Sequence, residues 1–252
     1  MTTVTLGHPE TILHAAAAAA VVRVLEAYDL DVEYVTGSRD ELTAAMKAGG
    51  IDLFVSAWLP DVDAVWADPS LGMDPLGELY KPVFGWFMPE GCAPGVVSIA
   101  DLGLDDGVVN RNIVAAESVL ERVRLGVGSY GLTERGFTID ARPDEEAWQY
   151  AAKAIETGEA AVLPLWQPHF LHHGGRLRPL EDPRTVLAGE QAARMLVRRE
   201  ARAELDSDLL DELDELMLGH KVVSALEYAV RCDGMTGDEA AEAWQRGKLL
   251  PR

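Results

Sequence analysis

Ala161-Val-Leu-Pro-Leu-Trp-Gln-Pro-His-Phe170 is the segment around which the rest of the chain is best interpreted. Its apolar first half predicts a short buried strand that ends at Trp166, just before a proline. Ile51-Asp-Leu-Phe-Val-Ser-Ala-Trp-Leu-Pro60 has the same form, with a strand that ends at Trp58. In open α/β sheets, ligands bind beyond the carboxyl ends of the strands. The two indoles therefore predict a pocket that is walled by aromatic faces.

The N-terminal third alternates predicted strands and helices, which is typical of a parallel sheet covered by helices. Gly7-His8-Pro9-Glu10 is predicted to be a turn, with an Ala-rich helix beginning at about Pro9 and running to about Tyr28. Ser38 and Glu41 have the spacing of a capping box, which predicts a second, shorter helix. Strands are expected at residues 2–6, 32–35 and 51–57.

The rest of the chain predicts a second α/β half and then a helical tail. An apolar stripe favours a helix over residues 112–127, and Pro143 marks the start of another helix that ends at Gly158. After a strand expected at residues 192–197, three further helices follow, the last with a capping box at Thr236. Two α/β halves predict two lobes, and a cleft between lobes is the default ligand site.

Composition limits the possible classes of function. The chain has 252 residues, 48% of them hydrophobic, and a net charge of -20. This charge argues against nucleic acid and against anionic membrane surfaces as partners. The apolar run at residues 15–22 is too short to span a membrane and lacks the basic flank of a signal peptide. The sequence therefore indicates a cytosolic protein or a mature form without its leader, with no direct membrane insertion.

Metal and covalent chemistry find no support in the sequence. Cys92 and Cys232 are too few for a zinc site and are expected to be two buried thiols. His8 and His14 do not have the i, i+4 spacing of a helical metal pair. No nucleophile motif and no Gly-rich phosphate loop occurs. We therefore expect no cofactor, no metal and no catalytic residue.

The tryptophans are the informative side chains. A single Trp is more often part of a core than a ligand wall, but Trp58 and Trp166 both end strands just before a proline. Tryptophan faces attract quaternary ammonium groups by cation–π interaction. His169 and the N–H groups at the start of the first helix are suited to hold a carboxylate. This combination predicts a zwitterionic ligand such as a betaine.

Four motifs give the chain a resemblance to the substrate-binding proteins of glycine betaine/proline betaine ABC transporters. Residues 52–60 resemble the family's D-x-F-x-x-x-W-L-P, and residues 165–169 resemble its W-x-P-H. Residues 177–183 resemble L-x-x-L-E-D-P, and residues 240–244 resemble A-A-x-x-W. The sequence departs from the family pattern at Phe170, where the family has a second Trp, and at Leu165, where it has a Gly.

The resemblance implies an α/β, two-lobed type II periplasmic-binding-protein fold with a ligand cleft between the lobes. One lobe would contain residues 1–84 and 178–252, including the helical tail, and the other residues 85–177. The resemblance also implies ligand-binding roles for particular side chains. Trp58 and Trp166 would be cage walls, His169 a carboxylate partner, and His8 and Glu10 part of the turn that receives the carboxylate. Trp148 is a candidate third wall.

The function that follows is the substrate-binding component of an ABC transporter. It would capture a small quaternary ammonium compound, such as glycine betaine or choline, by hinge closure and deliver it to a membrane permease, as in osmoprotection. The resemblance implies an extracytoplasmic location, whereas the absence of a signal peptide in this chain leaves the cytoplasm open. The alternatives are a cytosolic sensor or enzyme with the same fold, and an interaction protein with a degenerate pocket.

Overall fold

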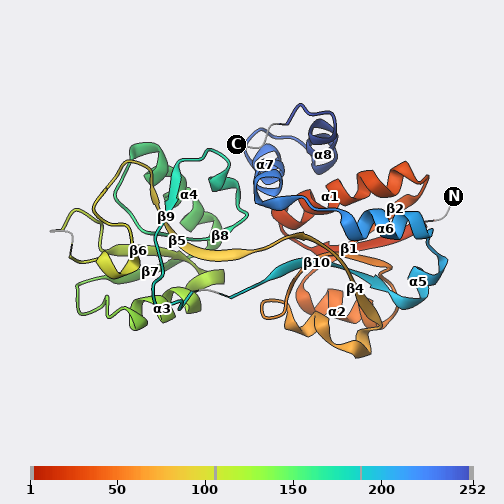
Figure 1. Cartoon of the computed structure of the whole chain (residues 1–252), viewed down its shortest axis with the longest axis horizontal. Coiled ribbons are helices and arrows are strands. Elements are labelled where there is room, and N and C mark those ends of the chain that lie inside the picture. The colour runs from red at the N-terminus through yellow and green to blue at the C-terminus, as the bar shows by residue number, and fades with distance from the viewer. Residues whose placement is uncertain (1–2, 105–106, 188, 250–252) are drawn as a thin grey trace. The chain divides into compact units, whose positions relative to one another are not determined.

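The computed structural model describes residues 3–104, 107–187 and 189–249. Within these ranges the chain forms two compact α/β units (Figure 1). The first unit contains the chain up to Pro82, residues 168–173 and the chain from Glu190 onward. The second unit contains Val83–Gln167 and Gly174–Gly189, so the chain passes between the units four times. The lobe boundaries that we expect at residues 84/85 and 177/178 stay a prediction.

The first unit is built on a five-stranded sheet with the order β2-β1-β3-β10-β4. The first three strands in this order are parallel, and β10 runs antiparallel to β3 and to β4. The strands are β1 (Thr3–Pro9), β2 (Asp31–Gly37), β3 (Leu53–Leu59), β4 (Met73–Tyr80) and β10 (Ala192–Arg198). The helices are α1 (Ile12–Ala27), α2 (Arg39–Lys47), α5 (Arg199–Glu204), α6 (Ser207–Glu215), α7 (Gly219–Arg231) and α8 (Gly237–Gln245).

The Ala-rich helix α1 is the centre of one layer of this unit. It lies on one side of the sheet together with α7 and α8, and α2 covers the other side (Figure 1). Residues 16–22 of α1 are all buried, as expected for a helix that is apolar around most of its circumference. Alanine side chains allow the neighbouring helices to approach α1 closely. The N-cap Thr11 accepts a hydrogen bond from the backbone N–H of His14, which starts the helix beside the end of β1.

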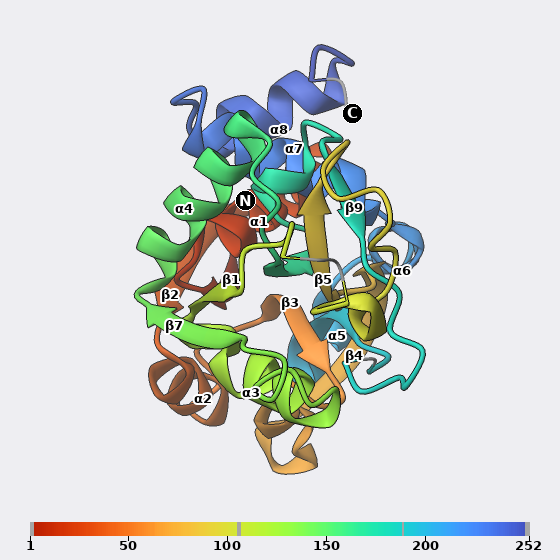
Figure 2. The same cartoon turned by 90° about the vertical axis from the view of Figure 1, so that its left-hand side faces the viewer.

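The second unit has its own sheet and its own core. Its three-stranded sheet has the order β8-β5-β9, and Figure 2 shows β9 beside β5. A parallel pair, β6 and β7, lies in the same unit. The strands are β5 (Val83–Pro89), β6 (Asn112–Ala116), β7 (Thr138–Arg142), β8 (Leu163–Gln167) and β9 (Leu177–Pro179). The helices are α3 (Leu120–Ser129) and α4 (Asp144–Thr157). Trp86, fully buried, is at the centre of the core.

Short 3-10 helices complete both units. They are Ala64–Ala67, Pro69–Leu71 and Phe170–His172 in the first unit, and Ile99–Asp101 and Glu117–Val119 in the second. The capping boxes expected at Ser38 and Thr236 are confirmed, because each hydroxyl accepts from the third helical N–H and each glutamate bonds back. Gly158 ends α4 in the left-handed conformation, as predicted.

Three sequence predictions about secondary structure are wrong. The predicted turn at Gly7-His8-Pro9 is part of β1, because these residues pair with β2 as far as Pro9 and Gly37. Residues 112–127 do not form one helix, because residues 112–116 pair with β7 as the strand β6. The prolines and glycines of residues 66–77 are typical of irregular structure, yet residues 73–80 form β4. This strand lies at the sheet edge, where proline is tolerated.

The cysteines agree with expectation in part. Within the described residues neither Cys92 nor Cys232 is in a disulfide, but Cys92 is only half-buried and Cys232 is exposed. No helix in the described part of the chain is both long and apolar enough to cross a bilayer.

Candidate functional site

The first predicted cage wall, Trp58, is at the end of a strand that carries a bulge. Between the pairs Ala57–Arg194 and Phe54–Leu196, β3 has one residue more than β10. Ser56, within this bulge, has a φ of 73°, a left-handed backbone conformation that is costly for a residue other than glycine. Bulges redirect the side chains that follow them. The bulge therefore sets the direction of the Trp58 indole.

Trp58 is held by hydrogen bonds at both its backbone and its ring. Its backbone N–H donates to the carboxylate of Asp63 at 2.8 Å, and its indole Nε1–H donates to the Tyr80 hydroxyl at 3.1 Å. The Tyr80 hydroxyl lies 2.5 Å from the Ser56 Oγ, and the two aromatic rings meet edge to face at 6.4 Å. The indole is 7% exposed, so a ligand would meet a nearly dry, preorganised ring.

His14 is the third ring of this group. Its imidazole lies 5.6 Å from the Trp58 ring at an interplanar angle of 37°. Burial, and next the charge of His8, lower the pKa of His14 to about 3, against a smaller opposing effect of the Ser56 backbone. The ring is therefore neutral at pH 7. Together we call Trp58, Tyr80, Ser56 and His14 the first cluster.

The structure places His8 and Glu10 in different surroundings. His8 is buried, its Nδ1 lies 2.8 Å from the Pro9 carbonyl oxygen, and burial lowers its pKa. Its ring meets that of Tyr34 edge to face at 5.9 Å. Glu10 is exposed, and within the described residues its side chain makes no hydrogen bond or ion pair. Ligand-binding roles for both residues stay predictions.

His169 is buried and is held in the first unit by α7. Its backbone N–H donates to the Ser224 hydroxyl at 3.2 Å, and the next N–H, of Phe170, donates to the Glu227 carboxylate at 2.7 Å. Its Nδ1 accepts from the Leu171 N–H at 3.4 Å, which favours the tautomer with a proton on Nε2. Burial and then the charges of His172 and Arg231 hold the pKa of His169 well below its usual range. A neutral imidazole with Nε2–H can donate to a carboxylate.

The second predicted wall, Trp166, belongs to the second unit and has a different kind of neighbour. It is half-buried in β8 and is paired across the sheet with Phe84 of β5, the two rings lying 5.4 Å apart. The guanidinium carbon of Arg122, on α3, lies 4.9 Å from the centre of the Trp166 ring and 5.9 Å from that of Phe84. Trp166, Phe84 and Arg122 form the second cluster.

Trp148 lies on α4 in the same unit as Trp166. It is half-buried and, with Ala147 and Ala151, lines a small cavity together with the β8 residues Pro164 and Leu165 that precede Trp166. The structure therefore puts Trp148 beside the strand that carries the second wall. Its role as a third wall stays a prediction.

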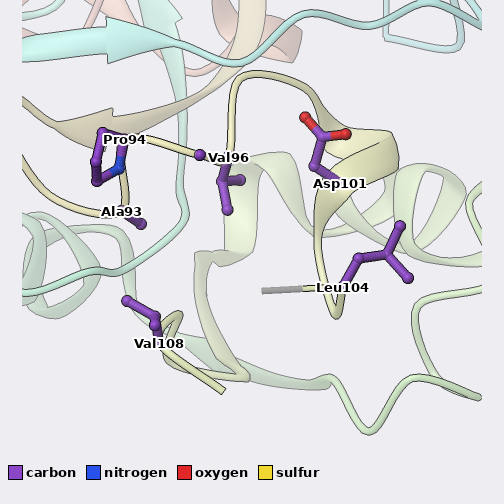
Figure 3. Close-up of a pocket in the computed structure, with 7 residues that line it drawn as sticks. Ala93, Pro94, Val96, Asp101, Leu104 and Val108 are labelled. Carbon is purple, nitrogen blue, oxygen red and sulfur yellow. The ribbon is translucent and has the colours of Figure 1, made fainter. Parts of the chain in front are cut away.

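A separate hollow of about 370 Å³ in the second unit has no aromatic lining (Figure 3). Val96, Leu104 and Val108 give it an apolar surface, and Asp101 is the one acidic side chain among the lining residues that the structure describes. That carboxylate accepts hydrogen bonds from the N–H groups of Val97 and Ser98. The hollow contains none of the site residues that the sequence predicts.

Metal binding is not suggested by the geometry. Within residues 3–104, 107–187 and 189–249, no group of three or more His, Cys, Asp or Glu side chains is arranged to hold a metal ion. The ionisable groups near the two walls are instead imidazoles, one buried aspartate and one guanidinium.

Sequence reasoning missed five members of the two clusters: Tyr80, Ser56, His14, Phe84 and Arg122. Tyr80 ends a strand that proline and glycine obscure, and Arg122 is one of several charges on α3. Phe84 lies in an aromatic-rich run that is typical of an extended segment, which was a detectable signal. The remaining four have no local pattern that marks them.

Comparison with known proteins supports the assignment of the chain to one protein family. A family model described as the substrate-binding domain of the ABC-type glycine betaine transport system matches residues 2–246. No curated protein sequence matches the chain. Similar solved structures include lactococcal OpuAC in complex with glycine betaine, at 21% identity and a TM-score of 0.76, covering 98% of this chain and 96% of that one.

Two further structures have the same fold. A choline-binding protein of an ABC transporter, in complex with choline, is 18% identical with a TM-score of 0.70, covering 99% of this chain and 90% of that one. The ProX glycine betaine/L-proline-binding protein of Borrelia burgdorferi is 17% identical with a TM-score of 0.71, covering 100% of this chain and 97% of that one. These likenesses confirm the predicted fold class, the α/β periplasmic-binding fold.

Proposed function

Because the chain belongs to the family of substrate-binding domains of ABC-type glycine betaine transport systems, we propose that it captures a small quaternary ammonium compound for a membrane permease. The family membership also confirms the resemblance drawn from the four sequence motifs. The family serves transport and is not an enzyme family. Neither the family match nor the structural neighbours support a cytosolic sensor or enzyme.

The first cluster is the observation that carries the proposal for this chain. A quaternary ammonium group has no N–H donors, so it gains little from a carboxylate as hydrogen-bond acceptor and much from an aromatic face. Trp58 offers such a face, fixed by the Tyr80 hydroxyl and by Asp63. Its neighbour His14 is neutral at pH 7, so it does not repel a cation.

We assign the carboxylate end of the ligand to His169. The bond from the Leu171 N–H to Nδ1 supports a proton on Nε2, and burial favours the neutral ring. A hydrogen bond from a neutral imidazole to a carboxylate fixes the orientation of the ligand without placing a positive charge in the site. His8 and Glu10 are assigned to the neighbourhood of the same end by family resemblance.

The proposal also covers the kind of chemistry and the cellular location. The chain binds and releases its ligand without covalent change, as the family's role in transport implies. It works outside the cytoplasm, as the family's role in substrate capture implies. We infer that Trp148 contributes apolar surface near Trp166.

The test is calorimetric titration of the purified protein with glycine betaine and choline, with tryptophan fluorescence recorded in parallel. The matched control ligand is 3,3-dimethylbutanoate, which replaces the cationic nitrogen of glycine betaine by carbon. We expect glycine betaine to bind and its neutral-headed isostere to bind at least roughly 30-fold more weakly, because a desolvated cation–π contact is worth about 2 kcal/mol. Equal binding of the two would show that no cation–π cage exists. Absence of binding by both natural ligands would overturn the proposed function.

A further inference from the structure

Arg122 places a positive charge on one of the proposed cage walls. Its guanidinium carbon lies 4.9 Å from the Trp166 ring centre and 5.9 Å from that of Phe84, both within the range of cation–π contact. A quaternary ammonium ligand would draw on the same ring electrons. The second cluster therefore already contains a cation that belongs to the protein itself.

The charge of Arg122 is not neutralised by its neighbours. The acidic residue before it in the helix, Glu121, pairs with Arg124 at 2.6 Å. Within the described residues, Arg122 itself makes no salt bridge and no hydrogen bond. Because guanidinium stays protonated at all physiological pH values, the second cluster keeps its positive charge.

This charge acts differently on cationic and zwitterionic ligands. A purely cationic ligand at Trp166 is repelled by the guanidinium, whichever face of the indole it contacts. A ligand that also bears a carboxylate recovers part of the loss, because its net charge is zero and its carboxylate is attracted by the guanidinium at longer range while His169 holds it. Unit charges about 8 Å apart, at an effective dielectric constant of about 20 to 40, change a binding constant by roughly 5- to 30-fold.

We propose that Arg122 is a specificity-determining residue, which makes this protein favour zwitterions with a carboxylate over simple cations. The proposal rests on the proposed function, since it concerns the choice among quaternary ammonium ligands. It narrows the substrate class to betaine-like compounds. Choline, which has the same trimethylammonium group with a hydroxyl in place of the carboxylate, is the disfavoured ligand.

The experiment measures the ratio of the dissociation constants for choline and glycine betaine in the wild type and in Arg122→Gln. We expect the wild type to prefer glycine betaine, and the variant to shift the ratio by roughly 10-fold toward choline. Arg122→Lys retains the charge and should keep most of the preference. Arg124→Gln is the matched control, because it removes one positive charge from the exposed side of the same helix and should leave the ratio unchanged.

The outcomes separate the two proposals. If the wild type binds glycine betaine but the ratio in Arg122→Gln stays within about two-fold, Arg122 does not set specificity, while the proposed function stands. An equal shift in Arg124→Gln would also overturn the proposal, since it would assign the effect to net charge. If the wild type binds neither ligand, the proposed function is wrong and the role of Arg122 is wrong with it. Circular dichroism of each variant confirms that it is folded.

Discussion

Trp58 and Trp166 follow nearly the same sequence pattern, yet their surroundings differ in charge. Trp58 is 7% exposed, its Nε1–H is bonded to Tyr80, and its ring neighbours Tyr80 and His14 are neutral. Trp166 is half-buried, and the guanidinium of Arg122 lies over its ring. Of the two proposed walls, one is thus a fixed ring beside neutral rings, and the other is an aromatic face that carries a cation.

The difference shows that a strand-end tryptophan does not define its own chemistry. Ring electrons attract any cation, including one from the protein. What a ligand gains at each wall therefore depends on which residues other elements bring there. We expect Trp58 to contribute more than Trp166 to the binding of the quaternary ammonium group.

The largest expected effect comes from Trp58→Ala. It should weaken glycine betaine binding by roughly 100-fold, because it removes a desolvated cation–π contact worth about 2 kcal/mol and the apolar surface around it. Calorimetry measures the loss. Trp58→Phe, which keeps an aromatic face but loses the bond to Tyr80, should lose less. Unchanged affinity in Trp58→Ala would remove Trp58 from the site.

The neutrality of the first cluster can be tested by pH. The pKa of His14 is lowered to about 3 in the folded protein from an unfolded value of 6.5, so the unfolded state binds more protons between these values. The contribution of His14 to stability is complete above pH 6.5 and is lost as the pH falls toward 3. Between pH 7 and pH 5, His14 alone should cost about 2 kcal/mol of unfolding free energy.

Urea unfolding of the wild type and of His14→Gln at pH 7 and pH 5 measures this contribution. The variant should lose less stability than the wild type when the pH falls. His8 and His169 act in the same direction, because burial lowers the pKa of each. Equal losses in the two proteins would mean that His14 is not held neutral by the fold.

The bonding of the first wall can be tested with Tyr80→Phe. The change removes the hydroxyl that joins Ser56 to the Trp58 indole, and with it two buried hydrogen bonds. We expect a loss of about 1 to 2 kcal/mol in unfolding free energy and a smaller loss in affinity. Tyr34→Phe is the control. Because Tyr34 is 46% exposed, the unfolding free energy of this variant should equal that of the wild type. A similar loss in both variants would contradict a special role for Tyr80.

The smallest effect is expected for Trp166→Ala. It should weaken glycine betaine binding by roughly 5-fold, because Arg122 already uses the ring electrons of this wall. In the Arg122→Gln background the same change should cost more, and the difference is the coupling energy of a double-mutant cycle. A loss for Trp166→Ala equal to that for Trp58→Ala would erase the proposed contrast between the two walls.

Much of the fold was predictable because its signals are local. The apolar runs at residues 51–57 and 161–166 became β3 and β8, and the capping boxes at Ser38 and Thr236 start helices as expected. Residues 112–116 were not predictable in this way, since their apolar spacing suits a helix until β7 pairs with them. Pairing with a distant segment outweighs intrinsic preference in such short runs.

The residues of the candidate site also fall into those with a local sequence signal and those without one. Trp58, Trp166 and His169 could be singled out from sequence because each is near a proline at a strand end, where chain direction exposes side chains. The partners of these residues could not. Tyr80 reaches Trp58 only because β10 lies between β3 and β4, and His14 does so because α1 begins beside the sheet.

By itself, the sequence determined the alternation of strands and helices, the positions of the strand-end tryptophans and the family to which the chain belongs. Only the tertiary structure decided that the Trp58 ring lies beside the neutral rings of Tyr80 and His14 and that Trp166 lies beneath Arg122. The physical reason is how far apart in the sequence the interacting residues lie. Caps and strand ends depend on residues three or four positions apart, whereas burial, pKa values and cation–π contacts depend on segments that only folding brings together.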